Sequence, residues 1–182
     1  MEYVEPIRDK RDVWNVADYL KKKNEKYYIL FVLGCYSGLR VSDILKLRVR
    51  DIRGRESVVI YEQKTKKRKS FPINREIRRD IEQYCKDKPA SGYLIPADKA
   101  PGHPVCRSYV YRMIREAGEY YGLDHLGTHT MRKTFGYHFY NQTGDVATLQ
   151  RIFNHHDEKT TLRYIGIEQE HIDKVMEKFT LK

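Results

Sequence analysis

The chain has 182 residues, enough for one domain with a proper core, and its 35 lysines and arginines outnumber 25 aspartates and glutamates. The net charge of +10 favours a polyanionic partner: DNA, RNA or an anionic membrane. No apolar run approaches the roughly 20 residues that cross a bilayer, and the first residues lack a signal-peptide pattern. We therefore expect a cytoplasmic protein without a membrane partner. The 3 cysteines are scattered, which argues against a disulfide or zinc scaffold.

Apolar periodicity in the first part of the chain predicts helices. After Asp9, apolar residues recur at helical spacing. The segment 25–36 is apolar almost all round, which predicts a central helix, and Gly38 can take the left-handed cap that ends it. A short helix over 42–47 is expected to follow at once, with Ser42 as its N-cap.

The middle of the chain predicts a β-hairpin and then helices only. Residues 57–63 are β-branched and aromatic, and after a lysine-rich turn the segment 69–73 returns. Asn74 caps a predicted helix that runs to about residue 86, and the proline-rich stretch 88–104 is a predicted loop. Further helices are predicted over 105–121, 129–143, 145–153, 157–164 and 167–179. The fold class is therefore mainly α with a small antiparallel β-sheet (α+β), in a single domain over 1–182.

Two basic segments could bind one anion. His129 and Arg132 stand three positions apart at a helix start, so both side chains point to the same side. An imidazole and a planar guanidinium there suit a phosphate, and the helix N-terminus adds partial positive charge. Far upstream, Arg40 lies in G-L-R-V-S-D, where Asp43 could orient it or help to seat His129 or Arg132. Taken singly, each of these residues is more often a surface residue.

Three further side chains carry chemistry only in context. His155 and its neighbour His156 have no carboxylate or second histidine at helical ligand spacing, so we expect no metal site. Tyr164 is one of 15 tyrosines, but a deprotonated phenol can attack phosphorus, and the ester conserves the energy of a phosphodiester bond. Lys64 lies at the hairpin turn, where a solvated lysine is the usual interpretation, although its ammonium could protonate a leaving oxygen.

Together these segments resemble the boxes of a tyrosine recombinase of the phage integrase family, in the same order along nearly the whole chain. G-L-R-V-S-D resembles the box of the first catalytic arginine, E-Q-K-T-K the hairpin lysine, and H-T-M-R-K-T-F the histidine and second arginine. F-N-H-H-D-E-K-T-T-L-R-Y resembles the final box, in which a histidine precedes the nucleophilic tyrosine by nine positions. The resemblance implies the tyrosine recombinase catalytic-domain fold. It also implies a DNA strand transferase, a site-specific recombinase or integrase of a phage or mobile element, that works through a 3′-phosphotyrosyl intermediate.

The resemblance also implies a role for each matching residue: Arg40, Lys64, His129, Arg132, His155 and Tyr164, with Asp43 in support. Arg40 and Arg132 would clamp the scissile phosphate, and His155 would donate to it as well. His129 would accept the proton of Tyr164, the nucleophile, and the hairpin lysine would protonate the departing 5′ oxygen. No cofactor and no metal are implied, because the arginine pair replaces the charge of a magnesium ion.

The implied partner is double-stranded DNA in a bacterial or phage-infected cell, where the protein would be associated with the nucleoid. The family's N-terminal DNA-clamping domain has no counterpart in residues 1–182, which implies weak and poorly sequence-specific binding. Asn154 stands where glycine is common, which a turn tolerates because asparagine also accepts a left-handed φ. The tail 166–182 carries a helix with an apolar side. We expect it to dock in trans within a tetramer on DNA, and in cis in an isolated monomer.

Two alternatives stay open on sequence grounds. One is a non-enzymatic DNA-binding or regulatory relative, against which the intact set of family residues argues. The other is a type IB topoisomerase-like enzyme, against which the box sequences and the short chain argue. The target DNA site, the choice between integration, excision and dimer resolution, and cleavage in cis or in trans are not determined by these residues.

Overall fold

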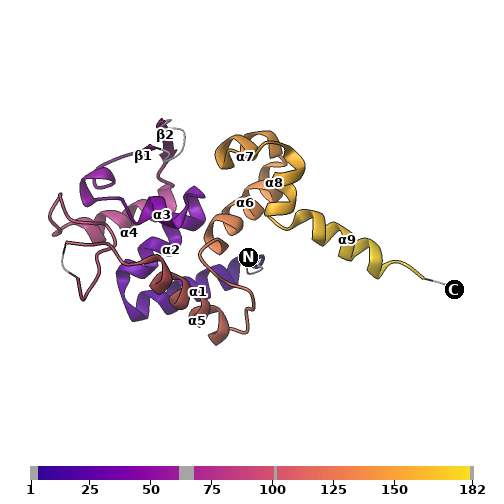
Figure 1. Ribbon diagram of the computed structural model, residues 1–182, viewed down its shortest axis with the longest axis horizontal. Coiled ribbons are helices and arrows are strands. Elements are labelled where there is room, and N and C mark those ends of the chain that lie inside the picture. Colours follow the sequence, from indigo (N-terminus) through magenta and orange to yellow (C-terminus); the bar gives the residue numbers. More distant parts are fainter. Residues whose placement is uncertain (1–3, 62–67, 101, 181–182) are drawn as a thin grey trace.

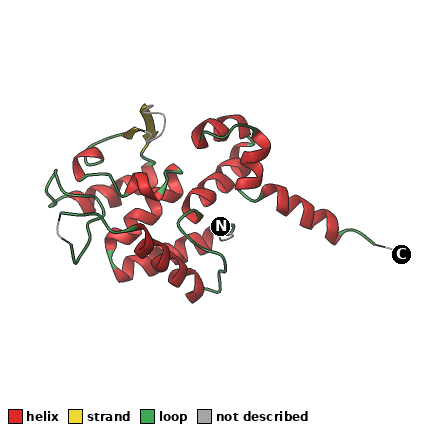
Figure 2. Ribbon diagram, viewed as in Figure 1, coloured by secondary structure: helices red, strands yellow, loops and turns green. Residues whose placement is uncertain are grey.

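The computed structural model describes residues 4–61, 68–100 and 102–180. Most of this is helical, and one small sheet stands at the edge of the helical body, as Figure 2 shows. The elements are α1 (Lys10–Lys23), α2 (Glu25–Ser37), α3 (Val41–Ile44), η1 (Val49–Asp51), β1 (Ser57–Tyr61), β2 (Arg68–Pro72), α4 (Arg75–Cys85), α5 (Arg107–Tyr120), α6 (Thr130–Thr143), α7 (Val146–Phe153), α8 (Glu158–Tyr164) and α9 (Ile167–Glu177). The predicted fold class, mainly α with a small antiparallel sheet, is confirmed.

Helix α2 is the centre of the body, as its uniformly apolar sequence predicts. Residues from one end of the helix to the other are buried, and α1, α4 and α6 all pack against it. At its start the Asn24 side chain accepts the backbone N–H of Lys26. At its end Gly38 has φ 64°, the predicted left-handed cap, and a Cβ there would lie only 2.5 Å from Cδ1 of Phe135. The chain therefore turns sharply at Gly38, where it lies directly against Phe135 of α6.

The short helix after this turn differs from its prediction. It spans Val41–Ile44 instead of 42–47, and the cap position belongs to Arg40, whose side chain makes no capping hydrogen bond. Ser42 is therefore not the N-cap. The helix stops early because the next residues join a distant loop: the N–H of Leu94 donates to the carbonyl of Leu47 over 2.8 Å.

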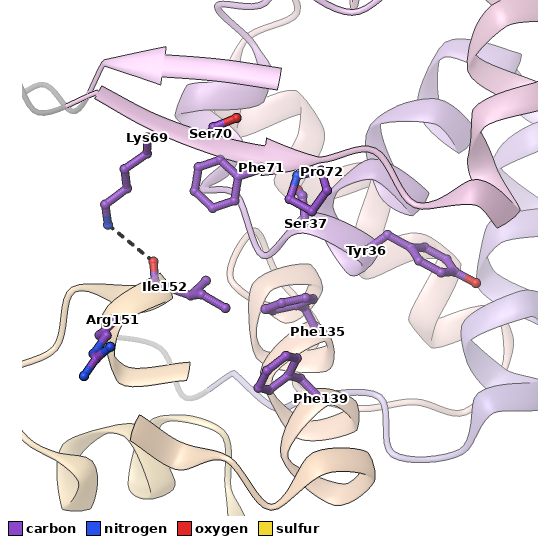
Figure 3. Close-up of a pocket in the computed structure, with 10 residues that line it drawn as sticks. All are labelled: Tyr36, Ser37, Lys69, Ser70, Phe71, Pro72, Phe135, Phe139, Arg151 and Ile152. Carbon is purple, nitrogen blue, oxygen red and sulfur yellow. Dashed lines mark hydrogen bonds between the residues drawn. The ribbon is translucent and has the colours of Figure 1, made fainter. Parts of the chain in front are cut away.

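The predicted hairpin is formed by β1 and β2, which pair antiparallel from Ser57↔Pro72 to Tyr61↔Arg68. Strand β2 faces α6 and α7 across an apolar cavity of about 420 Å³, and Nζ of Lys69 donates to the carbonyl of Ile152 over 3.5 Å (Figure 3). This contact joins the hairpin to α7. Residues 62–67, where the sequence predicts a turn that carries Lys64, lie outside the described residues.

Helices α6, α7 and α8 form a compact group with its own small apolar cluster, around Leu149, Phe153 and Ile165. Gly136 on α6 permits the close approach: a Cβ there would lie 2.6 Å from Cγ2 of Ile165 and 2.8 Å from the ring of Phe153. Between α7 and α8, Asn154 has φ 55° and ψ 47°, so the expected left-handed conformation is confirmed.

Helix α9 extends away from the body of the molecule (Figure 1). Its apolar residues are exposed, with Ile172 at 47%, Val175 at 54% and Met176 at 66% of their surface. In this structure α9 is not docked on the body in cis, and how the tail docks in solution stays a prediction. Among the described residues, no helix is both long and apolar enough to span a membrane.

Candidate active site

Arg132 lies at the centre of the site and is 4% exposed. Its guanidinium donates to the carbonyl of Gly38, just after α2, and over 3.0 Å to the carbonyl of Phe153, the last residue of α7. Both carbonyls stand at helix C-termini, which lack intrahelical partners and carry partial negative charge. Arg132 therefore ties two helix ends to α6, and these two contacts fix the direction of its planar fork. The guanidinium also lies over the ring of Phe153, 4.1 Å from its centroid.

Tyr164 meets His129 in the same subunit. Helix α8 ends at Tyr164, and His129 occupies the cap position of α6. The Tyr164 hydroxyl lies 3.2 Å from Nδ1 of His129, close enough for a hydrogen bond whose direction depends on the imidazole tautomer. The Tyr164 ring is held edge-on by Phe153, at 5.4 Å between centroids. The phenol oxygen is thereby placed beside a potential proton acceptor.

His155 joins the same group from the turn after α7. Its ring lies 5.1 Å from the ring of Tyr164, centroid to centroid, and its Nδ1 shares a 3.1 Å hydrogen bond with Oγ1 of the buried Thr161. The left-handed Asn154 makes the tight turn that brings His155 back toward α8. His155 is therefore oriented by a fixed contact.

Arg40 and Arg132 line one small cavity, of about 60 Å³. The first comes from the junction of α2 and α3 and the second from α6, so two segments far apart in sequence meet there. Ser42 and Thr128 add hydroxyl groups to the wall, and His129 completes it beside Tyr164. The convergence of the two arginines expected from the sequence is thus present in the structure.

The electrostatics of the site favour neutral imidazoles and a phenol that needs help to ionise. Burial first, then the positive charges of Arg107 and Arg132, lowers the pKa of His129, and burial with Arg132 lowers the pKa of His155. Burial raises the pKa of Tyr164, which the arginines oppose through their charge and, for Arg132, a hydrogen bond. Burial lowers the pKa of Arg132 to about 10, so it stays charged at neutral pH.

Two of the expected site residues, Asp43 and Lys64, are not among the described residues that line the cavity. Asp43 on α3 is close enough for its negative charge to raise the pKa of Arg132, against the effect of burial. This electrostatic interaction is consistent with the role expected for Asp43 beside Arg132. Lys64 lies outside the described residues.

Within the described ranges, no group of three histidine, cysteine or carboxylate side chains could hold a metal ion.

Two basic residues of the site were not anticipated. Lys133 places its Nζ 5.2 Å from the centroid of the Tyr164 ring, and it directly follows Arg132 in sequence. Arg107, the first residue of α5, lines the cavity with Arg40 and Arg132. A weak signal for Arg107 did exist: α5 has no acidic residue in its first turn, where acidic residues are favoured.

Comparisons with known proteins identify the family of this chain. The model of the phage integrase family matches residues 9–171. The probable integrase/recombinase YoeC of Bacillus subtilis is 43% identical over 170 residues, covering 93% of each chain.

Solved structures share the fold. The XerH recombinase bound to its palindromic difH substrate superposes with a TM-score of 0.74 at 15% identity, over 97% of this chain and 54% of that one. The catalytic domain of bacteriophage HP1 integrase gives 0.63 at 19% identity, over 98% and 96%. The chain spans 59% of the tyrosine recombinase XerA of Pyrococcus horikoshii, to which it is 25% identical. The chain belongs to the phage integrase family, the tyrosine recombinases, which are DNA strand-transferring enzymes of site-specific recombination.

Proposed function

We propose that this chain is the catalytic domain of a recombinase that cleaves and rejoins DNA through a covalent bond to Tyr164. The observation that carries the proposal is the 3.2 Å contact between the Tyr164 hydroxyl and Nδ1 of His129, beside the buried Arg132. A phenol, a neutral imidazole and a fixed guanidinium at one place are the groups that attack on a phosphodiester requires. Because Tyr164 lies against His129 of its own chain, we propose attack in cis.

The proposed step balances as a transesterification. Neutral His129 takes the phenol proton through Nδ1, the Tyr164 oxygen attacks phosphorus, and a 3′-phosphotyrosyl bond forms while the bond to the 5′ oxygen breaks. Arg40, Arg132 and His155 donate to the nonbridging oxygens, where negative charge grows. Asp43 helps to hold Arg132. The guanidinium groups of Arg40 and Arg132 supply the positive charge that stabilises these oxygens, so the proposed step uses no metal or cofactor. Rejoining is the same step in reverse.

We propose Lys64 as the acid that protonates the departing 5′ oxygen. The hairpin that carries it is joined to α7 by the contact between Lys69 and the carbonyl of Ile152, and α7 leads into His155. This attachment of β2 to α7 supports the proposal that the hairpin works close to the site. If a 5′-bridging phosphorothiolate, whose sulfur leaves without protonation, fails to rescue Lys64→Ala, the assignment is wrong.

A covalent-trapping assay tests the proposed function. A pool of nicked suicide duplexes with a randomised core would be incubated with the protein, and covalent complexes would be recovered by denaturing electrophoresis and sequenced. Wild-type protein should be trapped, and Tyr164→Phe, which removes one oxygen and keeps the ring contacts with Phe153 and His155, should not. Trapping that survives in Tyr164→Phe would refute the nucleophile. Binding without trapping would favour the non-enzymatic DNA-binding alternative.

We also propose that the domain assembles as a tetramer on double-stranded DNA in the bacterial cytoplasm, associated with the nucleoid, and is monomeric without DNA. The exposed apolar side of α9 supports docking of this helix on a neighbouring protomer. Removal of residues 167–182 should leave a folded monomer that binds a single site but forms no higher complex in sedimentation. Persistence of the tetramer would contradict the role of α9.

A further inference from the structure

Arg107 lies where two kinds of positive charge coincide: its own guanidinium and the N-terminal end of helix α5. It is the first residue of α5, a helix of 14 residues whose first turn holds no acidic residue and whose cap residue, Cys106, makes no side-chain capping hydrogen bond. The first N–H groups of such a helix have no intrahelical partners, and its macrodipole is positive at this end. Arg107 lines the small cavity of the site, and its charge acts on His129 in the same wall. Side chain and helix end thus direct positive charge to one place.

The cavity gathers more positive charge than its surroundings neutralise. Arg40, Arg107 and Arg132 all line it, together with His129. Among the described residues no ion pair joins Arg40 or Arg107 to a carboxylate, and Asp43 acts on Arg132. Like charges around one small space repel each other unless an anion lies between them. Planar guanidinium forks are the groups that bind a phosphate through paired hydrogen bonds.

We propose that Arg107 is a third arginine of the phosphate site, which binds nonbridging oxygens of the DNA phosphate beside Arg40 and Arg132. This rests on the function proposed above. Arg107 then has a second effect on the same step. Several nearby positive charges lower the pKa of His129, and the charge of Arg107 has the largest effect among them. It holds the phosphate and also keeps the proton acceptor neutral.

Three variants separate these effects from a structural role. Arg107→Ala removes both charge and fork, and Arg107→Lys keeps the charge but loses the paired donors. Arg112→Ala is the matched control, since Arg112 lies on the same helix with its guanidinium over the ring of Tyr109 and does not line the cavity. At saturating DNA, Arg107→Ala should slow single-turnover covalent trapping by about 100- to 1,000-fold, as loss of one transition-state donor does. Arg112→Ala should leave this rate unchanged.

The pH profile supplies a readout that misfolding would not move. Trapping requires neutral His129, so its rate rises with pH through the lowered pKa of that group. Without the charge of Arg107 this rise should shift to higher pH, toward the ordinary histidine value of 6.5. Arg107→Lys should keep the wild-type profile at a reduced rate. Trapping by Arg107→Ala at the control rate, or a slower rate with an unmoved profile, would overturn the proposal.

A measurement without DNA keeps this test separate from the proposed function. The His129 ring would be titrated by NMR in each variant, with and without millimolar inorganic phosphate. The His129 pKa should be higher in Arg107→Ala than in wild type, and phosphate should perturb the ring in wild type and Arg112→Ala only. If no protein is trapped by any duplex but these shifts appear, the proposed function fails and the phosphate site stands. Absence of both shifts refutes the site, whatever the outcome of trapping.

Discussion

Replacement of Arg132 by methionine separates what this residue does for chemistry from what it does for stability. The guanidinium is buried, spans two helix ends and lies over the Phe153 ring. Methionine has a shorter side chain of similar volume, and its sulfur can keep a favourable contact with that ring. Arg132→Met therefore removes the charge and the donors while filling most of the same space.

The expected change in stability is a small difference between opposing effects. Burial lowers the pKa of Arg132 from 12.5 to about 10. At about 1.4 kcal/mol for each pH unit, the charged form costs the folded state about 3 kcal/mol. This cost applies in full below the folded-state pKa and declines only as pH rises through it, so at neutral pH Arg132→Met relieves all of it. Against this relief, the carbonyls of Gly38 and Phe153 lose their donor, at about 1–3 kcal/mol each.

Arg132→Met should therefore lower the free energy of unfolding by no more than about 3 kcal/mol. Covalent trapping should fall about 1,000-fold or more. Denaturant unfolding and the suicide-substrate assay measure the two quantities on the same preparation, with Arg112→Met as the control for lost charge. A loss of stability well above 5 kcal/mol would show that Arg132 is chiefly a structural clamp between helix ends. Near-normal trapping in a folded variant would refute its role at the phosphate.

Three further predictions concern proton transfer and backbone geometry. Because burial lowers the pKa of His129, the acid limb of the trapping rate should lie below pH 6.5, and a limb above that value would exclude it as the base. Gly136→Ala places a methyl group against Ile165 and Phe153, so thermal unfolding should show a loss of about 1–3 kcal/mol, and an unchanged melting temperature would contradict the packing. Asn154→Gly should match or exceed wild-type stability, whereas Asn154→Val should lose about 1–2 kcal/mol, because Asn154 is left-handed with φ 55°. Denaturant unfolding measures both variants, and equal stability of the two would contradict this backbone conformation.

The elements that the sequence predicts well are those set by local chemistry. Asp9, Asn74, Asp145 and Asp157 each accept a backbone N–H at the start of a predicted helix. Gly38 takes the left-handed conformation for the same local reason, freedom from Cβ strain. The order and spacing of the family boxes can also be seen in the sequence alone. The resemblance to the family then predicts which of these distant residues meet in the fold.

What the sequence does not predict depends on contacts between distant segments. The end of α3 is set by the pairing of Leu47 with Leu94, which no local pattern records. Arg107 enters the site because α5 starts beside α6, although it lies outside every family box quoted above. The direction of α9 depends on whether an apolar side finds a partner, and amphipathic spacing is the same for docking in cis, docking in trans and exposure.

The site can be understood as a meeting of helix ends of opposite sign. The carbonyl ends of α2 and α7 lie behind Arg132 and accept its hydrogen bonds, while the amide ends of α5 and α6 carry Arg107 and His129 at the cavity. Negative ends hold the guanidinium in place, and positive ends add to the charge that faces an incoming phosphate. A cation held in this way has little left to reorganise when negative charge develops on the phosphate oxygens. The desolvation that lowers the pKa of Arg132 is therefore a cost of holding the charge ready before DNA binds.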